Sequence, residues 1–204
     1  MAVSDKLFVT TLYRAELPGT ARRNRELSAA CAAIAAGDKA GRGWAKAHGY
    51  KGYTSYASLN DLTFRSPEFA ELEKTLLPHA RKFAGLVDFD LAGGKLALDS
   101  LWINMLDHGG AHGGHIHPHS VISGTYYVAV PEGAAAIKFE DPRLPLMMAA
   151  PMRKKTARAH NRNFVSLTPK PGTLLLWESW LRHEVPPNRA RGQRISISFN
   201  YSMV

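Results

Sequence analysis

The stretch GTLLLWESWLRHEVPPNRARGQRISISFN, residues 172–200, holds two apolar strands joined by a polar connection that contains two prolines. In the second strand Arg194, Ser196 and Ser198 alternate with apolar residues. Successive side chains of a strand point to opposite faces, so the polar residues share one face and the apolar residues share the other. The alternation predicts a strand with an apolar face and with an arginine pointing into the protein from its polar face.

Similar apolar or alternating runs extend upstream as far as residue 95, separated by glycine, proline and charged turns. The expected strands cover residues 95–106, 121–130, 135–141, 163–169, 172–180 and 193–204. Before residue 94 the sequence favours helices. One covers residues 25–37, and the other begins after Ser66 with Pro67 at its first position and continues to Phe83.

Helices followed by many short strands predict an α+β fold that is mainly β, a sandwich or barrel with N-terminal helices packed on one face. We expect a single domain over residues 1–204. In this prediction residues 1–94 are mainly helical support, and residues 95–204 form the β-barrel core that carries the functional site.

Composition excludes several classes of protein. With 45% hydrophobic and 21% charged residues the chain is not of the disordered type, and no stretch approaches the roughly 20 apolar residues of a membrane span. The N-terminus has no signal-peptide pattern, and Cys31 is the single cysteine, so we expect a cytoplasmic protein. A net charge of +9 suggests an anionic partner without naming one, and the oligomeric state cannot be read from these residues.

Five of the nine histidines lie in HGGAHGGHIHPHS, residues 108–120. His115 and His117 are two residues apart, so on an extended segment their imidazoles project from the same face and can bind one metal ion. The pair alone is equally consistent with exposed polar residues in a glycine loop. His183, which follows the apolar stretch 172–181, offers a third imidazole and makes a metal site the favoured interpretation.

Arg194 and Ser196 predict a binding site for a carboxylate. An inward-facing guanidinium forms a fork that matches one carboxylate, and the hydroxyl two residues later adds a second donor. Burying the guanidinium without an anion would be costly. A small acid is therefore expected near this strand.

The motifs together resemble the iron(II)- and 2-oxoglutarate-dependent oxygenase superfamily. The resemblance rests on the HIHP motif at 115–118, on SGTYYV at 123–128, on FEDPR at 139–143, and on the stretch from 171 to 200. It is strongest for the bacterial and phage branch that carries an HxHP motif. It implies a double-stranded β-helix, which is a jelly-roll or cupin-like barrel, with Fe(II) as metal and 2-oxoglutarate as cosubstrate.

The implied activity is that of a dioxygenase: hydroxylase-type oxidation of a substrate that the sequence does not name, with succinate and CO2 as coproducts. By the same resemblance, His115 and His183 are metal ligands, and Arg194, assisted by Ser196, binds the far carboxylate of 2-oxoglutarate. Tyr127 matches a tyrosine that binds this carboxylate, or Tyr126 does if the strand register shifts by one.

Asn104 precedes His115 by eleven residues, and the resemblance suggests that it contacts the cosubstrate. The implied site contains no catalytic residue beyond the metal centre.

One position departs from the superfamily pattern, which places a carboxylate two residues after the first histidine. Here that residue is His117. Either His115, His117 and His183 bind iron as three neutral imidazoles, which we favour, or a carboxylate from elsewhere completes the site. Asp141 is then the best candidate, ahead of Asp107 and Glu184, although Asp141 can also be read as a turn residue paired with Arg143.

Residues 144–162 form a long loop with three methionines and five basic side chains, and we expect it to cover the substrate. The basic side chains are Arg153, Lys154, Lys155, Arg158 and Arg162. They favour an anionic partner, such as an acidic protein, a nucleic acid or a phosphorylated small molecule. Nucleic acid is not favoured because aromatic residues are absent from the loop. The alternative is a solvated loop with incidental charge.

Two other functions fit part of the sequence. A cupin-like three-histidine metalloenzyme that does not use 2-oxoglutarate would have no need for Arg194 and Ser196. A non-catalytic basic binding module with a structural metal would be expected to have four ligands, often with cysteines, whereas Cys31 is alone and far from the histidines.

Overall fold

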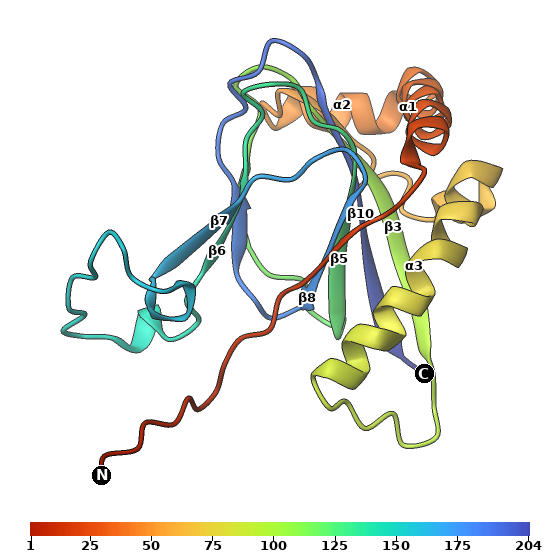
Figure 1. Cartoon of the computed structure of the whole chain (residues 1–204). Coiled ribbons are helices and arrows are strands. Elements are labelled where there is room, and N and C mark those ends of the chain that lie inside the picture. The colour runs from red at the N-terminus through yellow and green to blue at the C-terminus, as the bar shows by residue number, and fades with distance from the viewer.

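Ten strands form two facing antiparallel sheets, and three α-helices lie outside the larger one (Figure 1). The computed structural model describes residues 1–204. The larger sheet has the order β1-β8-β5-β10-β3-β2, and the smaller has the order β4-β9-β6-β7. The strands are β1 Tyr13–Glu16, β2 Gly52–Thr54, β3 Leu96–Leu106, β4 His112–His115, β5 Ile122–Ala129, β6 Ile137–Glu140, β7 Phe164–Leu167, β8 Thr173–Glu178, β9 His183–Val185 and β10 Arg194–Met203. The predicted fold class, a mainly β barrel with helices on one face, is confirmed.

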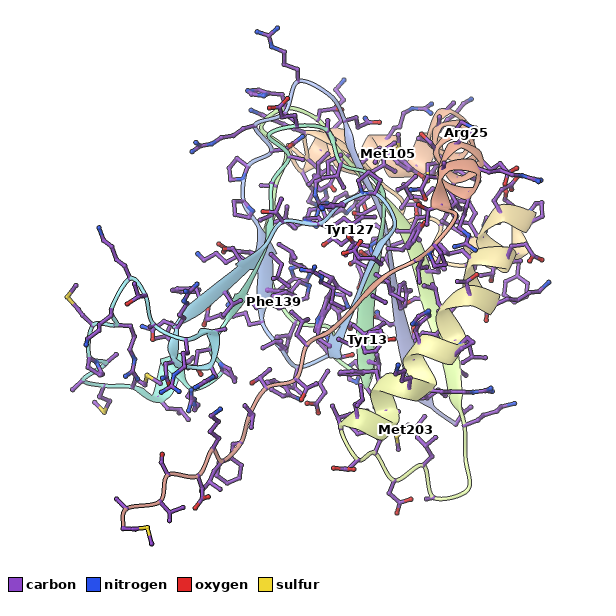
Figure 2. The ribbon with its side chains drawn as sticks, viewed as in Figure 1. Tyr13, Arg25, Met105, Tyr127, Phe139 and Met203 are labelled. Atoms are coloured by element: carbon purple, nitrogen blue, oxygen red, sulfur yellow. The ribbon has the colours of Figure 1, made fainter.

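The central strand β10 shows how the alternating sequence builds two different surfaces. It pairs with β3 on one side and with β5 on the other. Its apolar residues, among them Ile197 and Phe199, join the large hydrophobic core between this sheet and the helices. Its polar residues, which begin with Arg194, face the space between the two sheets. There they meet a smaller hydrophobic cluster that includes Tyr127 and Phe139 (Figure 2).

The helices follow the predicted apolar stripes and extend beyond them. Helix α3, Pro67–Leu86, buries one side against the larger sheet, and Pro67 lies at its start as expected. Helix α1, Thr20–Gly37, begins five residues before the predicted helix. Helix α2, Lys39–Ala47, was not predicted. It begins where the Asp38 carboxylate accepts a hydrogen bond from the backbone N–H of Gly41, at 2.8 Å.

The N-terminal half also supplies strands, which the sequence patterns did not reveal. Strand β1 pairs with β8, and β2 pairs with β3 at the outer edge of the larger sheet. The nearest edge strand of the smaller sheet is β4, which pairs only with β9. Strands β2 and β4 are not hydrogen-bonded to each other, and the boundary between these two sheet edges is called the seam below. No helix combines the length and apolar character needed to span a bilayer.

Candidate metal centre

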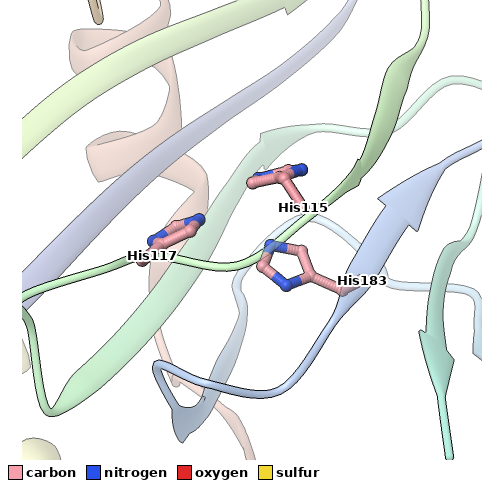
Figure 3. Close-up of side chains that lie close together, drawn as sticks. All are labelled: His115, His117 and His183. Carbon is pink, nitrogen blue, oxygen red and sulfur yellow. The ribbon is translucent and has the colours of Figure 1, made fainter. Parts of the chain in front are cut away.

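Three imidazoles meet between the sheets, at the facing ends of β4 and β9. His115 lies directly opposite His183 in the strand pairing, and His117 follows β4 by two residues. One nitrogen of each side chain lies within 4.8 Å of the others (Figure 3). The ring centroids of His115 and His183 are 4.4 Å apart, and the His117 centroid lies 5.1 Å from each. This spacing suits a single metal ion bound by three nitrogens.

Backbone carbonyls fix the tautomers of two of these histidines. Nδ1 of His115 lies 2.7 Å from the carbonyl oxygen of Gly113, and Nδ1 of His183 lies 2.9 Å from that of Leu181. A carbonyl oxygen can only accept, so each Nδ1 carries the proton. The lone pair is then on Nε2, the nitrogen available to a metal.

The third histidine is oriented by side chains. Nδ1 of His117 lies 2.7 Å from Oδ1 of Asn200, and Ser123 contacts both partners through its hydroxyl, at 2.9 and 2.8 Å. Because the amide oxygen accepts, Nδ1 of His117 donates and Nε2 is again free. All three rings therefore present the same kind of ligand atom.

Burial favours the neutral, metal-binding form of His117 and His183, and also the neutral form of the neighbouring His112. Desolvation lowers the pKa of His183 to about 3 and also lowers the pKa of His117. Desolvation, with the nearby Arg194 guanidinium as second cause, lowers the pKa of His112 to about 3. For His117 and His183 the lowered pKa means that a metal ion does not have to displace a proton from Nε2 at neutral pH.

These shifts predict that the metal-free protein loses stability as the pH falls from 7 to 5. Below an unfolded pKa of about 6.5 the unfolded state binds protons that folded His112 and His183 do not, so stability falls with pH. Each residue contributes at most about 1.4 kcal/mol per pH unit. Urea unfolding at pH 7, 6 and 5 measures the slope. The slope should be smaller in His183→Gln, and an equal slope in both proteins would contradict the prediction.

Arg194 is a buried cation without a carboxylate partner. Arg194 is 1% exposed. Its guanidinium donates only to the carbonyl oxygen of Ala135 and to Oγ of Ser196, both at 3.2 Å. The guanidinium carbon lies 5.0 Å from the ring centroid of Tyr127. The hydroxyl of Tyr127 is buried and has no hydrogen-bond partner. A buried charge and an orphan hydroxyl side by side indicate a site for an acidic ligand.

One cavity of about 390 Å³ contains both the histidine cluster and Arg194. No aspartate, glutamate or lysine lines it. The residues that the sequence analysis favoured for metal and cosubstrate all line this cavity: His115, His117, His183, Arg194, Ser196, Tyr127 and Asn104. A cluster that can hold a metal ion and a buried guanidinium therefore share one cavity.

Asn104 lines the cavity, but its amide is already hydrogen-bonded to neighbouring side chains. Both the NH2 group and the oxygen of the amide have hydrogen-bond partners when the NH2 group donates to Oγ1 of Thr54, at 2.9 Å. The oxygen then accepts from Oγ of Ser198, at 3.1 Å, and from Nε1 of Trp102, at 3.2 Å. Asn104 therefore holds the indole of Trp102 in position.

The structure decides between the two tyrosines. Tyr127 faces Arg194, whereas Tyr126 points to the helices and donates its hydroxyl to Asn24 in α1, at 2.6 Å. The one-residue register shift does not occur: β5 pairs Tyr127 with Ser196, and paired residues of neighbouring strands point to the same face of the sheet.

The carboxylate alternatives neither line the cavity nor join the histidine cluster. Asp141 accepts two hydrogen bonds from the Arg143 guanidinium, at 2.9 and 2.8 Å, which lower the pKa of its carboxyl. Asp107 accepts from Gln193, and Glu184 pairs with Lys138. None of the three carboxylates lines the cavity, and the turn interpretation of Asp141 describes its position.

Several cavity residues were not predicted. Tyr50 and His112 meet across the seam, with 2.6 Å between the hydroxyl oxygen and Nε2. Trp44, Tyr56 and Trp102 add aromatic surface to the cavity. The aromatic residues of 50–56 are visible in the sequence, but only the pairing of β2 with β3 brings them to the site.

The long loop 144–162 does not cover this cavity, contrary to expectation. It extends from the β6–β7 hairpin away from the barrel (Figure 1). None of its residues lines the cavity with the histidines, and its end instead lines a second cavity of about 730 Å³ together with residues 4–10. The physical reason is the position of β6 and β7 at the far edge of the smaller sheet, opposite the seam.

Facing antiparallel sheets with three imidazoles and a buried arginine in one cavity define a metalloprotein of the jelly-roll class. The sequence of residues 100–200, from β3 to β10, matches the family described as "Putative 2OG-Fe(II) oxygenase". This region, which contains every favoured site residue, therefore belongs to the iron(II)- and 2-oxoglutarate-dependent oxygenase superfamily, whose members are oxidoreductases that use these two cofactors. The resemblance seen in the sequence is confirmed. A search of curated proteins gave no match.

Solved structures share the fold at low sequence identity. EctD from S. alaskensis, with 2-oxoglutarate and 5-hydroxyectoine, is 16% identical with a TM-score of 0.65, over 96% of this chain and 73% of its own. SnoN, an α-ketoglutarate-dependent epimerase from nogalamycin biosynthesis, is 14% identical with a TM-score of 0.62, over 95% and 76%. A prolyl-4-hydroxylase from Pseudomonas putida is 12% identical with a TM-score of 0.58, over 96% and 94%. These likenesses establish the double-stranded β-helix fold.

Proposed function

We propose that His115, His117 and His183 bind iron(II) through their Nε2 atoms. The support is the convergence of the three rings together with acceptors that hold every Nδ1 proton. Three neutral ligands leave the ion its full positive charge, which favours an anionic cosubstrate. A carboxylate ligand is not needed in this arrangement.

The far carboxylate of 2-oxoglutarate is proposed to bind Arg194. The single observation that carries this proposal is the buried guanidinium, which has no acidic partner in the protein. Ser196 adds a hydroxyl donor, and the unpartnered hydroxyl of Tyr127 supplies another. Asn104 acts through Trp102 in this proposal, because its amide is fully used by protein groups.

Bound iron(II) would supply the oxidising chemistry with O2 as the oxidant: one oxygen atom would enter 2-oxoglutarate, which yields succinate and CO2, and the other would be inserted into a substrate C–H bond. The chain's own residues provide orientation and exclusion of water. Trp177 packs edge-on against His183, with centroids 4.7 Å apart, and restricts that ring. The absence of acidic side chains in the cavity leaves Arg194 free for an anionic ligand.

Anaerobic titration with iron(II) and 2-oxoglutarate tests the proposal. We expect a visible charge-transfer absorption from the chelate, saturating at one equivalent of each. Iron binding without this absorption would favour a three-histidine metalloenzyme that does not use 2-oxoglutarate. Failure to bind iron would favour a non-catalytic module.

We also propose a domain organisation, a location and a role for the basic loop. Residues 1–204 are taken as one domain, with β1 and β2 from the N-terminal part completing the larger sheet. A cytoplasmic location is supported by the free thiol of Cys31. The basic loop is proposed to contact an anionic partner outside the cavity, since none of its five basic side chains forms an ion pair within the protein.

The position of the loop predicts that it is dispensable for the metal centre. Replacing residues 146–157 by a short glycine and serine linker should change the Kd of 2-oxoglutarate by less than about twofold. None of these residues lines the cavity that contains the histidine cluster and Arg194. Calorimetry on the iron-loaded variant measures this. A folded variant that no longer binds 2-oxoglutarate would show that the loop supports the site.

A further inference from the structure

The seam between β2 and β4 leads from the surface into the cavity. On the side of β2 and β3 it is lined by Tyr56 and Trp102, whose rings meet edge to face with centroids 5.1 Å apart. On the side of β4 it is lined by Ile116 and Pro118. Tyr56 is 57% exposed and Ile116 is 45% exposed, although both are large and largely apolar. Exposed apolar side chains at the mouth of a cavity mark a binding surface.

This part of the cavity, called the ring subsite below (Trp102, Tyr56, Ile116 and Pro118), borders the metal centre. The centroid of Trp102 lies 5.6 Å from that of His117. Arg194 lies at the start of β10, beside Tyr127 and the buried Ser196. Trp102 pairs with Ser198, four residues further along β10. A diacid that extends from the histidines to Arg194 therefore leaves the ring subsite free, and to this extent the inference rests on the proposed function.

The electrostatics of the cavity restrict what can enter it. Arg194 is the only lining side chain with a permanent charge, and a diacid would neutralise it. A charged group placed in the ring subsite would lose hydration without gaining a counterion. The neutral side chains there are aromatic or aliphatic, which favours an uncharged apolar ligand.

Size narrows the choice further. A volume of about 390 Å³ lies near the lower end of the range of about 300–1,000 Å³ for cavities that hold one small organic ligand. After a five-carbon diacid is bound, space remains for about one small ring. The T-shaped pair Tyr56–Trp102 offers aromatic surfaces against which a flat ring can pack.

We propose that the ring subsite binds an uncharged planar ring, and that this ring is the part of the primary substrate that faces the metal centre. Trp102 is the main contact, because its indole is held by Asn104 and lies next to His117. Ile116 and Pro118 cover the ring from the β4 side. The rest of the substrate stays outside the seam.

Fluorine NMR with three probes of similar size tests the inference: fluoroindole as a neutral ring, fluorobenzoate as an anion and fluorobenzylamine as a cation. The protein is loaded with Zn²⁺, so no turnover occurs, and each probe is measured before and after 2-oxoglutarate is added. We expect fluoroindole to remain bound when 2-oxoglutarate is added and then to bind more tightly than either charged probe. Displacement of fluoroindole by 2-oxoglutarate, or tighter binding of a charged probe in the presence of 2-oxoglutarate, would overturn the inference.

Two variants locate the bound ring. Tyr56→Ala should weaken fluoroindole binding by about 2- to 12-fold, the effect of losing one aromatic contact, and Ile116→Ala should weaken it as well. Phe64→Ala is the matched control, because Phe64 is an exposed aromatic residue outside the cavity. Binding that neither seam variant weakens would place the ring elsewhere and contradict the inference.

The same samples separate this inference from the proposed function. If the iron and 2-oxoglutarate absorption appears but no fluoroindole binds, the ring subsite alone is wrong. If fluoroindole binds with the expected dependence on Tyr56 while the absorption is absent, the ring subsite is supported and the proposed function is contradicted.

Discussion

Arg194→Met should raise the Kd of 2-oxoglutarate by about 30-fold or more while leaving iron bound. The guanidinium has no carboxylate partner in the protein, so its charge is available to the ligand. Truncating one partner of a buried, hydrogen-bonded charge pair costs about 2 kcal/mol or more, which corresponds to this factor. Calorimetric titration of the iron-loaded variant with 2-oxoglutarate measures the change.

The melting temperature of the same variant shows whether Arg194 serves binding or folding. An apolar side chain of similar length removes a buried, uncompensated charge, so the ligand-free variant should be as stable as the wild type or more stable. Ser196→Ala is the graded control and should weaken binding by about tenfold or less, because it removes one hydroxyl donor. Unchanged affinity in Arg194→Met would exclude the arginine from the cosubstrate site.

His117→Ala should reduce iron affinity by more than about 100-fold. Loss of a residue that only orients a ligand costs about 10- to 100-fold in metal affinity, so loss of a ligand itself should cost more. Asn200→Ala, which removes the acceptor of the His117 Nδ1 proton, should fall in that smaller range. Competition with a chelator of known affinity gives both values.

His119→Ala is the matched control for this experiment. His119 belongs to the same histidine-rich segment, but it is exposed and lies outside the cluster. It should bind iron as the wild type does. Stoichiometric iron at wild-type affinity in His117→Ala would instead require a ligand from elsewhere in the chain and would contradict the three-imidazole site.

Long elements could be predicted from the sequence because they contain several periods of their pattern. The ten residues of β10 alternate over their whole length, and the apolar stripe of α3 repeats over five turns. Strands β2, β4 and β9 have three or four residues each, too few for a pattern to be distinguished from chance. Their pairing depends on neighbours that lie far away in the sequence.

The candidate site was predictable where one short segment carries the chemistry. The spacing of His115 and His117 and the Arg194–Ser196 pair each lie within three residues, so local geometry brings them to one face. The Tyr50–His112 contact joins residues 62 positions apart, and no local pattern could indicate it. The loop 144–162 shows the opposite error, since its length and charge suggested a lid but its hairpin lies opposite the seam.

The sequence by itself indicated the barrel class, the inward arginine and the His115–His117 pair, because alternation and short spacings are properties of contiguous residues. His183 was added from its place after an apolar stretch and from the family resemblance. The tertiary structure decided that Tyr127 rather than Tyr126 faces Arg194, that Asp141 lies away from the histidines, and that the cavity opens between β2 and β4. These outcomes depend on strand register and on which sheet edges remain unpaired. Both are set by the free energy of packing segments that are distant in the chain, which no local pattern encodes.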